Sequence, residues 1–255
     1  MEADPKVATN YHTLEAEVIA ELSTRDRFAP IEERQDTGVL ALDVISTISH
    51  GKYQTFWRGV SLMKDPLDQT ILQQLLWELK PRTVIEFGAY KGGSALWIAD
   101  MLKLFGCQSR VVSIDMDLSL LDAEVRKSSD VEFIQGDSFQ VEKVLSSTFR
   151  RNLHHPWLLM EDAHVNLVRV LEYLDKFIEP GDYICVEDSN PLAPGAGQGL
   201  VKKRGYKAYG PSKMNELRKF LTGRSDRYLV DQKYTDFFGS PGHPFITASD
   251  DGFTL

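Results

Sequence analysis

Residues 83–94 contain a glycine turn whose composition could bind a ligand. Residues 83–87 are an apolar run typical of a buried strand. Gly88, Gly92 and Gly93 follow, where the strand should pass into a helix. Glycine lets the backbone approach a ligand closely, and the free N–H groups of a first helical turn would face that ligand. The sequence therefore predicts a ligand site at this turn, and the alternative is a strand-to-helix turn that binds no ligand.

The spacing within the turn separates two kinds of ligand. A dinucleotide fingerprint reads G-x-G-x-x-G and packs its glycines under a pyrophosphate. Here Glu86 precedes Gly88, and three residues then separate Gly88 from the next glycine. A carboxylate at the strand end would repel a pyrophosphate, but it suits a ligand that carries an ammonium group, such as S-adenosylmethionine. The candidate cofactor-binding residues of the turn are Glu86, Gly88, Tyr90, Lys91, Gly92 and Ser94.

Acidic residues also follow the next two predicted strands. Residues 110–115 end in Asp115, where a parallel sheet would hold the two hydroxyls of a ribose. Residues 131–135 are followed by Asp137 and Ser138, and the acid could face an adenine amino group. Any one of these acids alone is more often a helix cap or a solvated carboxylate. Acids at three successive strand ends together favour an adenosyl ligand.

A second group of acids follows the strands expected near 157–161 and 183–187. Because the carboxyl ends of neighbouring parallel strands border one crevice, these acids should converge. Like charges packed together are costly unless a cation neutralises them, and oxygen ligands suit a hard ion such as Mg²⁺. The alternative is two solvated acidic turns that cap helices. The candidate metal ligands are Glu161, Asp162, Glu187 and Asp188.

His164 follows the first acidic pair at the same predicted crevice. Imidazole titrates near neutral pH, so His164 is a candidate proton acceptor, and a hydrogen-bonded histidine at a helix start is an equally good interpretation. The candidate catalytic residues are His164, Glu161 and Asp162.

Length and composition exclude several classes of protein. The chain has 255 residues and a formal net charge of −8, which argues against a nucleic-acid partner that depends on phosphate neutralisation. No apolar run reaches the length of a membrane span, and no signal peptide opens the chain. Cys107 and Cys185 lack metal-site spacing. We therefore expect a cytoplasmic protein with reduced thiols and no membrane partner.

Strand and helix patterns alternate from Thr83 onward, which favours a parallel, doubly wound sheet covered on both faces. We expect an α/β fold with a mostly parallel seven-stranded sheet and an antiparallel closing pair at 227–231 and from about Tyr234. Residues 1–64 are expected to form a helical N-terminal extension or lid, ahead of a main domain at 65–255. The apolar positions of its two helices are Leu14, Val18, Ile19 and Leu22, then Val39, Leu40, Leu42, Val44, Ile45 and Ile48.

At these residues the chain resembles the Rossmann-like methyltransferases grouped as the cephalosporin hydroxylase and rhamnosyl O-methyltransferase family. The matching pieces, within about residues 65–240, are Glu86 to Ser94, Asp115, Glu161 to His164, Val186 to Asp188, and Gly210 to Lys213. The resemblance implies a Rossmann-like methyltransferase domain over 65–255 that binds S-adenosylmethionine at its first two strand ends. It also implies a divalent metal held by Glu187, Asp188 and an acid after the fourth strand. An aspartate is usual where this chain has Glu161, so either Glu161 or Asp162 could face the metal.

The residues and the resemblance together predict methyl transfer from S-adenosylmethionine to an oxygen of a small-molecule acceptor. Mg²⁺ or another divalent cation would assist if the acceptor is a hydroxyl, whereas a carboxylate acceptor would need neither base nor metal. A nicotinamide-dependent oxidoreductase and a non-catalytic binding protein on the same fold are the alternatives. A homo-oligomer is left open.

A glycine- and proline-rich stretch from Ser189 to Pro211 follows the second acidic pair. Long loops inside a compact domain are often lids or binding loops. Its Lys202, Lys203 and Arg204 suit an anionic acceptor, and a solvated basic face is the more common explanation for such a group. We expect these side chains to affect acceptor binding rather than cofactor binding.

Overall fold

The structure is a computed structural model that describes residues 13–20, 26–34, 40–190, 209–235 and 245–248. Within them, one large sheet has the strand order β1-β9-β10-β8-β7-β4-β5-β6. Five neighbouring strands are parallel, which confirms the predicted alternation of strands and helices. The parallel strands are β4 (Thr83–Phe87), β5 (Arg110–Asp115), β6 (Val131–Gln135), β7 (Trp157–Glu161) and β8 (Tyr183–Val186).

Antiparallel strands close the sheet beyond β8. β10 (Phe245–Ala248) pairs with both β8 and β9 (Tyr228–Asp231), and β1 (Phe28–Ala29) pairs with β9. The described sheet therefore has eight strands, and the predicted number of seven is wrong. Phe28–Ala29, in the segment predicted to be helical, adds the eighth strand because the edge of β9 offers unpaired backbone groups. The last strand also starts later than expected, since Tyr234 lies in α10 (Gln232–Thr235).

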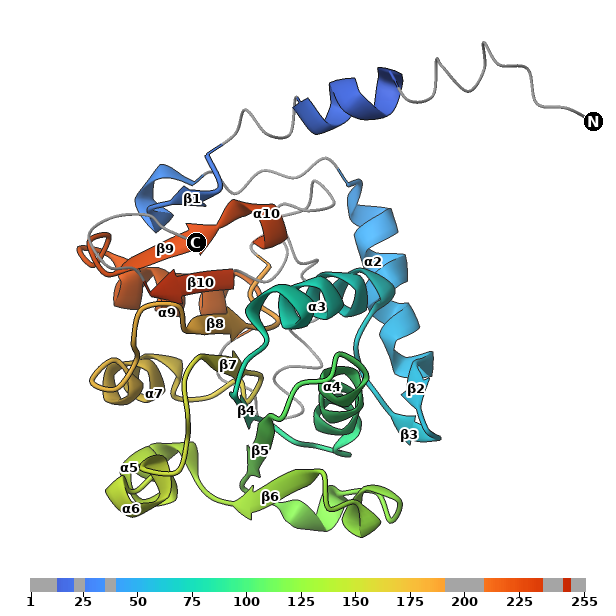
Figure 1. Cartoon of the computed structure of the whole chain (residues 1–255), viewed down its shortest axis with the longest axis vertical. Helices are drawn as coiled ribbons and strands as arrows, with labels where there is room; N and C mark the ends of the chain where they lie inside the picture. Colours follow the sequence, from blue (N-terminus) through green and yellow to red (C-terminus); the bar gives the residue numbers. More distant parts are fainter. Residues whose placement is uncertain (1–12, 21–25, 35–39, 191–208, 236–244, 249–255) are drawn as a thin grey trace, which may run out of the picture.

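Helices cover both faces of the sheet (Figure 1). α3 and α4 pack on one face, and α7 and α9 pack on the other. Successive residues of β4 point to opposite faces of the sheet. Val84 packs with α3 and α4 on one face, and Ile85 packs with α7 and α9 on the other. Besides α10 and the helical residues 13–20, the described helices are α2 (Leu42–Gly51), α3 (Pro66–Leu79), α4 (Gly93–Leu104), α5 (Val141–Val144), α6 (Ser147–Arg150), α7 (Leu167–Leu174) and α9 (Pro211–Leu221). Short 3-10 turns lie at Ile31–Glu33, Lys52–Gln54, Leu118–Leu120, Val125–Lys127 and Ser138–Gln140.

The described N-terminal residues include helical and extended segments. Residues 13–20 are helical and project from the rest of the chain in Figure 1, with Leu14, Val18 and Ile19 exposed. The hairpin of β2 (Phe56–Trp57) and β3 (Val60–Ser61) contacts α4. The division of the chain at residue 64 remains a prediction.

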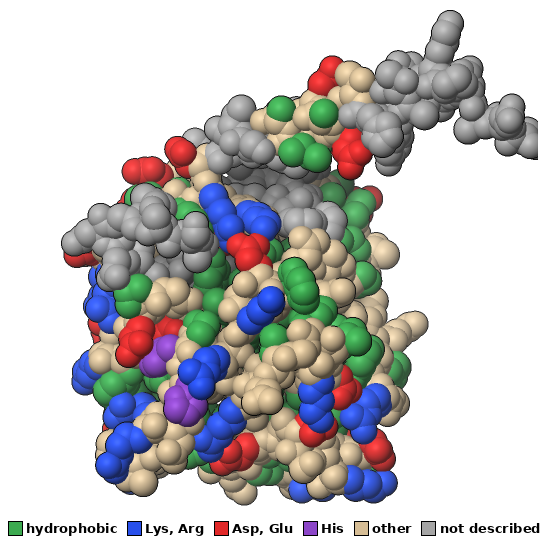
Figure 2. All heavy atoms as spheres, in the orientation of Figure 1, with side chains coloured by type: hydrophobic (Ala, Val, Ile, Leu, Met, Phe, Trp, Pro, Cys, Tyr) green, Lys and Arg blue, Asp and Glu red, His purple; other side chains and the backbone are tan. Residues whose placement is uncertain are grey.

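The described surface carries charges of both signs. Figure 2 shows Lys and Arg side chains interspersed with Asp and Glu side chains over one face of the molecule. In the described ranges, no helix is both long enough and apolar enough to cross a membrane. Cys107 and Cys185 are free thiols, and Cys185 is buried.

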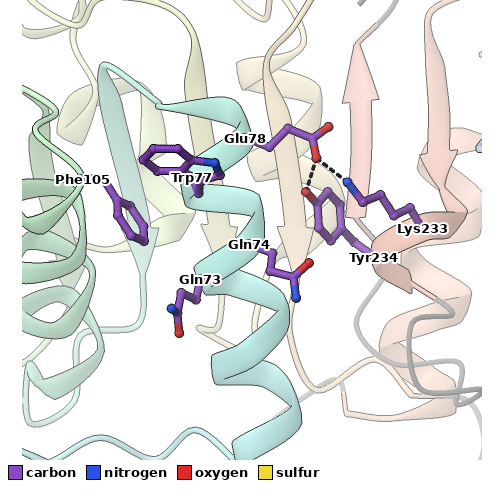
Figure 3. A pocket seen from close by; sticks show the side chains of 7 residues that line it. All are labelled: Gln73, Gln74, Trp77, Glu78, Phe105, Lys233 and Tyr234. Carbon is purple, nitrogen blue, oxygen red and sulfur yellow. Dashed lines mark hydrogen bonds and ion pairs between the residues drawn. The ribbon is translucent and has the colours of Figure 1, made fainter. Parts of the chain in front are cut away.

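A surface pocket lies between α3, the end of α4 and α10 (Figure 3). Glu78 accepts hydrogen bonds there from Lys233 Nζ and Tyr234 Oη, each at 2.5 Å. The lining residues are Gln73, Gln74, Trp77, Glu78, Phe105, Lys233 and Tyr234. None of them is a candidate site residue, so this pocket is separate from the predicted crevice.

The hairpin and α4 meet at a contact that admits no side chain. A Cβ atom added to Gly93 would lie 2.1 Å from the carbonyl oxygen of Ser61. Gly93→Ala should therefore displace the hairpin and lower the free energy of unfolding by about 1–3 kcal/mol. Gly51→Ala is the matched control, because Gly51 is also helical and nothing lies within 4 Å of its added Cβ. Urea unfolding of both variants tests this, and equal stabilities would contradict the contact.

Candidate active site

The turn after β4 is organised by a buried carboxylate. Glu86 is 0% exposed and accepts hydrogen bonds from Ser94 Oγ at 2.6 Å and from Ser113 Oγ. Burial raises the pKa of Glu86, while the positive charge of Lys64 opposes the shift. Glu86 thus joins β4, β5 and the first turn of α4, and it fixes the geometry of the predicted cofactor turn.

Glycine is required at two positions of this turn. Gly88 and Gly92 have φ angles of 101° and 82°, which favour glycine. A Cβ on Gly88 would lie 2.8 Å from the backbone carbonyl of Asp162, and Asp162 N–H donates to Phe87 O at 2.8 Å. The predicted cofactor turn therefore lies directly against the acidic segment after β7.

Asp115 holds the other side of the turn. Its carboxylate accepts backbone N–H groups from Tyr90 and Asp117, both at 3.0 Å. Tyr90 is exposed, and Lys91 Nζ lies 5.6 Å from the centre of the Tyr90 ring. Asp115 is half-buried, so its position at the end of β5 leaves it accessible beside the turn.

Asp137 and Ser138 form the next turn, after β6. Asp137 accepts the N–H of Phe139 at 2.9 Å, which makes it a cap of the short helical turn. Ser138 is buried, and its carbonyl accepts a hydrogen bond from Asn166 Nδ2 at 2.8 Å. These contacts position the turn, and they direct the Asp137 carboxylate toward its own backbone.

Sequence reasoning missed three exposed apolar side chains at the same strand ends. Met116 is 70% exposed, and Leu120 and Phe139 are also exposed. Met116 directly follows Asp115, and Phe139 directly follows Ser138. Exposed apolar groups beside polar strand-end residues are typical of a site that covers a flat apolar ligand. Their adjacency to the predicted acids was the signal that could have found them.

Asp162, His164 and Asp188 form a compact cluster at the ends of β7 and β8. His164 Nε2 lies 3.4 Å from Asp162 Oδ1 and 3.3 Å from Asp188 Oδ2. One ligand atom from each residue lies within 4.8 Å of the others. His164 is 5% exposed, and both His164 and Asp188 have positive φ angles, a strained conformation that often marks functional sites. Two carboxylates and an imidazole are a donor set that fits a divalent cation.

The structure places the other two predicted metal ligands against lysines. Glu161 is fully buried, and its Oε2 lies 2.7 Å from Lys213 Nζ. Glu187 Oε2 contacts Lys64 Nζ. The predicted convergence therefore groups Asp162 and Asp188 with His164, while Glu161 pairs with Lys213 and Glu187 shares Lys64 with Asp162.

Three lysines of the cluster were not identified as site residues from the sequence. Lys52 Nζ lies 3.2 Å from Asp188 Oδ1, and Lys64 Nζ lies 3.1 Å from Asp162 Oδ2. Burial alone would lower the pKa of Lys52, Lys64 and Lys213, but neighbouring carboxylates raise each pKa above its ordinary value. Lys213 could have been found, because it lies beside Met214 on the apolar face of its helix. Lys52 and Lys64 carry no comparable signal in the sequence.

The basic stretch is only partly described. Lys202, Lys203 and Arg204 lie outside the described residues. Tyr209, at its end, lies with its ring centre 5.9 Å from that of His164, and Gly210 N–H donates to Asp188 O at 2.6 Å. The end of the stretch therefore contacts the acidic cluster.

The fold and the site define a Rossmann-like α/β protein with a ligand turn and an acidic cluster at one sheet edge. The family described as "Rhamnosyl O-methyltransferase/CmcI" matches residues 50–254. The chain belongs to this family. The predicted resemblance is confirmed.

Two curated relatives match part of this chain. The rhamnosyl O-methyltransferase of Mycobacterium tuberculosis is 32% identical over 155 residues, and that of Mycobacterium leprae is 31% identical over 154 residues. Each match covers 57% of this chain, and it covers 63% and 66% of the two relatives respectively. The chain thus matches just under two thirds of the length of these curated relatives.

Solved structures of CmcI share the fold. A structure of CmcI with Mg-SAM has a TM-score of 0.57 and 27% identity, and it covers 77% of each chain. A CmcI apo-structure has a TM-score of 0.62 and 24% identity, and it covers 88% of this chain and 91% of that one. The likeness is spread along most of the chain.

Proposed function

We propose that this protein transfers the methyl group of S-adenosylmethionine to an oxygen of a small-molecule acceptor, assisted by a divalent cation. The observation that carries the proposal is the contact between the glycine turn and the acidic cluster. Gly88 packs on the backbone of Asp162, whose carboxylate belongs to the cluster with His164 and Asp188. A methyl donor bound at the turn would therefore lie beside an acceptor bound at the cluster.

The cofactor half of the site suits an adenosyl sulfonium. Asp115 is proposed to hold the ribose hydroxyls, and Met116 and Phe139, which are exposed, are proposed to cover the base. The candidate turn residues Glu86, Tyr90, Lys91 and Ser94 keep their predicted role, with Glu86 acting through the turn that it fixes. The CmcI relative, which is solved with Mg-SAM, supports this assignment.

The metal half of the site suits one divalent cation. Asp162 and Asp188 each place one carboxylate oxygen toward His164 and the other toward a lysine. A divalent cation held there would lower the pKa of an acceptor hydroxyl and fix its position. Direct metal ligation by Glu161 or Glu187 remains a separate prediction.

His164 is the proposed proton acceptor. The sulfonium already activates the methyl group, so the protein has mainly to align acceptor oxygen, methyl carbon and sulfur. When the acceptor oxygen bonds to the methyl carbon and the carbon–sulfur bond breaks, the proton would pass to the His164 imidazole or to a nearby carboxylate, while the carboxylates of Asp162 and Asp188 would hold the cation. Lys52 and Tyr209 border Asp188 and His164, so the N-terminal segment and the end of the basic stretch are proposed to enclose the acceptor. An anionic acceptor would suit the lysines of that stretch.

A dinucleotide fits the turn poorly. In dinucleotide-binding folds the pyrophosphate lies at the N-terminus of the helix after the first strand. The carbonyl oxygen of Ser61 lies against Gly93 at this helix start, where it places a partial negative charge. Nothing observed supports the nicotinamide-dependent or the non-catalytic alternative.

S-adenosylmethionine or its demethylated product should bind with micromolar-range affinity in calorimetry. Asp115→Ala should weaken binding by about 1–3 kcal/mol, because buried polar partners of the ribose are left unpaired. Asp130→Ala, which removes an acid from a surface ion pair with Lys103, is the control and should leave the affinity unchanged. Heat with NAD and none with either adenosyl compound would reject the proposal.

Mg²⁺ should raise the melting temperature of the protein, because a ligand that binds only the folded state stabilises it by mass action. Asp188→Asn should remove most of this rise by neutralising a cluster ligand. Glu161→Gln should retain the rise, because the Glu161 carboxylate is held by Lys213 and the N–H of Ala163. Thermal melts over a Mg²⁺ titration measure both variants. A lost response in Glu161→Gln with a normal one in Asp188→Asn would reverse the assignment of ligands.

A further inference from the structure

Lys64 is a buried lysine that contacts acids from two different strand ends at the acidic cluster. Its side chain is 2% exposed, and its Nζ lies 3.1 Å from Asp162 Oδ2 and contacts Glu187 Oε2. It therefore bridges the carboxyl ends of β7 and β8. A buried ammonium group is costly unless carboxylates pair with it, so these two contacts stabilise the charged form of Lys64.

The backbone around Lys64 fixes where its side chain can reach. The Lys64 carbonyl accepts hydrogen bonds from Thr55 Oγ1 at 2.8 Å and from Gln69 Nε2 at 3.1 Å. The next residue, Asp65, caps α3 by accepting the N–H of Leu67 at 2.9 Å. Lys64 is thus held between the hairpin and a helix start, and its position does not depend on the carboxylates alone.

The two carboxylate oxygens of Asp162 contact different side chains. Oδ2 faces Lys64, and Oδ1 faces His164. A carboxylate with one oxygen held in this way presents the other in a single direction. Lys64 also adds a positive charge next to a site proposed to bind a cation. Its two effects on that site have opposite signs, because it orients a ligand and also repels the metal.

We infer that Lys64 is a positioning residue that orients Asp162 and keeps the divalent-cation affinity of the cluster below the value that its carboxylates alone would give. The inference rests on the proposed function, because it concerns the same cation site. At the ends of β7 and β8, four carboxylates face three lysines: Lys52, Lys64 and Lys213. Removal of Lys64 leaves one more net negative charge beside the cation. A purely structural lysine would behave differently, since its loss would weaken cation binding and activity together.

Mn²⁺ binding to the full-length chain, measured by electron paramagnetic resonance, separates these effects. Lys64→Met should bind Mn²⁺ about tenfold or more tightly than the unaltered protein, because a nearby positive charge is lost. Methyl transfer should become slower in the same variant, because Asp162 is no longer oriented. Lys233→Met removes a lysine that pairs with Glu78 at the separate pocket, and it should leave Mn²⁺ affinity within about twofold.

A second pair of variants covers the case in which Lys64→Met does not fold. Lys64→Gln removes the charge but keeps a polar group, and it should also tighten Mn²⁺ binding. The double variant Lys64→Met with Glu187→Gln removes one charge of each sign, so its affinity should return toward that of the unaltered protein.

Each result decides a different claim. Weaker or unchanged Mn²⁺ binding in Lys64→Gln or a folded Lys64→Met would overturn the inference and leave the proposed function intact. Tighter binding with an unchanged rate of methyl transfer would overturn the positioning role. An unaltered protein that binds neither Mn²⁺ nor Mg²⁺ would overturn both the proposed metal site and the inference.

Discussion

The carboxyl ends of β4, β7 and β8 bring the buried Glu86, Glu161 and Glu187 together, with the half-buried Asp162 beside them. Buried carboxylates are costly unless they are hydrogen-bonded or paired with cations. Two serine hydroxyls satisfy Glu86, and internal lysines pair with the other three acids. Removing one partner of such a pair typically costs about 3–5 kcal/mol, because the other charge stays buried. The folded arrangement of acids at the carboxyl ends of these strands is therefore stabilised by lysines from other parts of the chain.

The three lysines at this edge come from two parts of the chain that are far apart in sequence. Lys52 follows α2, Lys64 precedes α3, and Lys213 lies in the first turn of α9. The hairpin crosses the start of α4 at Gly93, which brings the segment that carries Lys64 over the strand ends. The N-terminal residues and the helix after the basic stretch thus complete a site whose acids all come from the sheet. The family match over residues 50–254 includes all of these segments.

Much of the framework could be predicted from the sequence because it rests on local patterns. Apolar runs followed by acids located the five parallel strands, and the carboxyl-end rule brought Asp162, His164 and Asp188 to one place. The eighth strand could not be predicted, because Phe28–Ala29 is too short for a periodic signal and exists only through pairing with β9. Lysine partners were missed for a similar reason. A lysine before a helix is ordinary in a sequence, and only the tertiary contact of Lys64 with Asp162 gives it a role. The same holds for the four predicted metal ligands, because only their tertiary contacts show that Asp162 and Asp188 are the two that face His164.

The proposed reaction requires the methyl donor and the divalent cation to share one crevice. Paramagnetic relaxation in NMR spectroscopy can measure this directly. S-adenosylmethionine with a ¹³C-labelled methyl group would be bound to the protein in the presence of Mn²⁺. The contact of Gly88 with Asp162 predicts strong paramagnetic relaxation of the bound methyl resonance, and Asp188→Asn should abolish it. A methyl resonance that keeps its relaxation rate while Mn²⁺ is bound would show that the two sites are separate and would contradict the account.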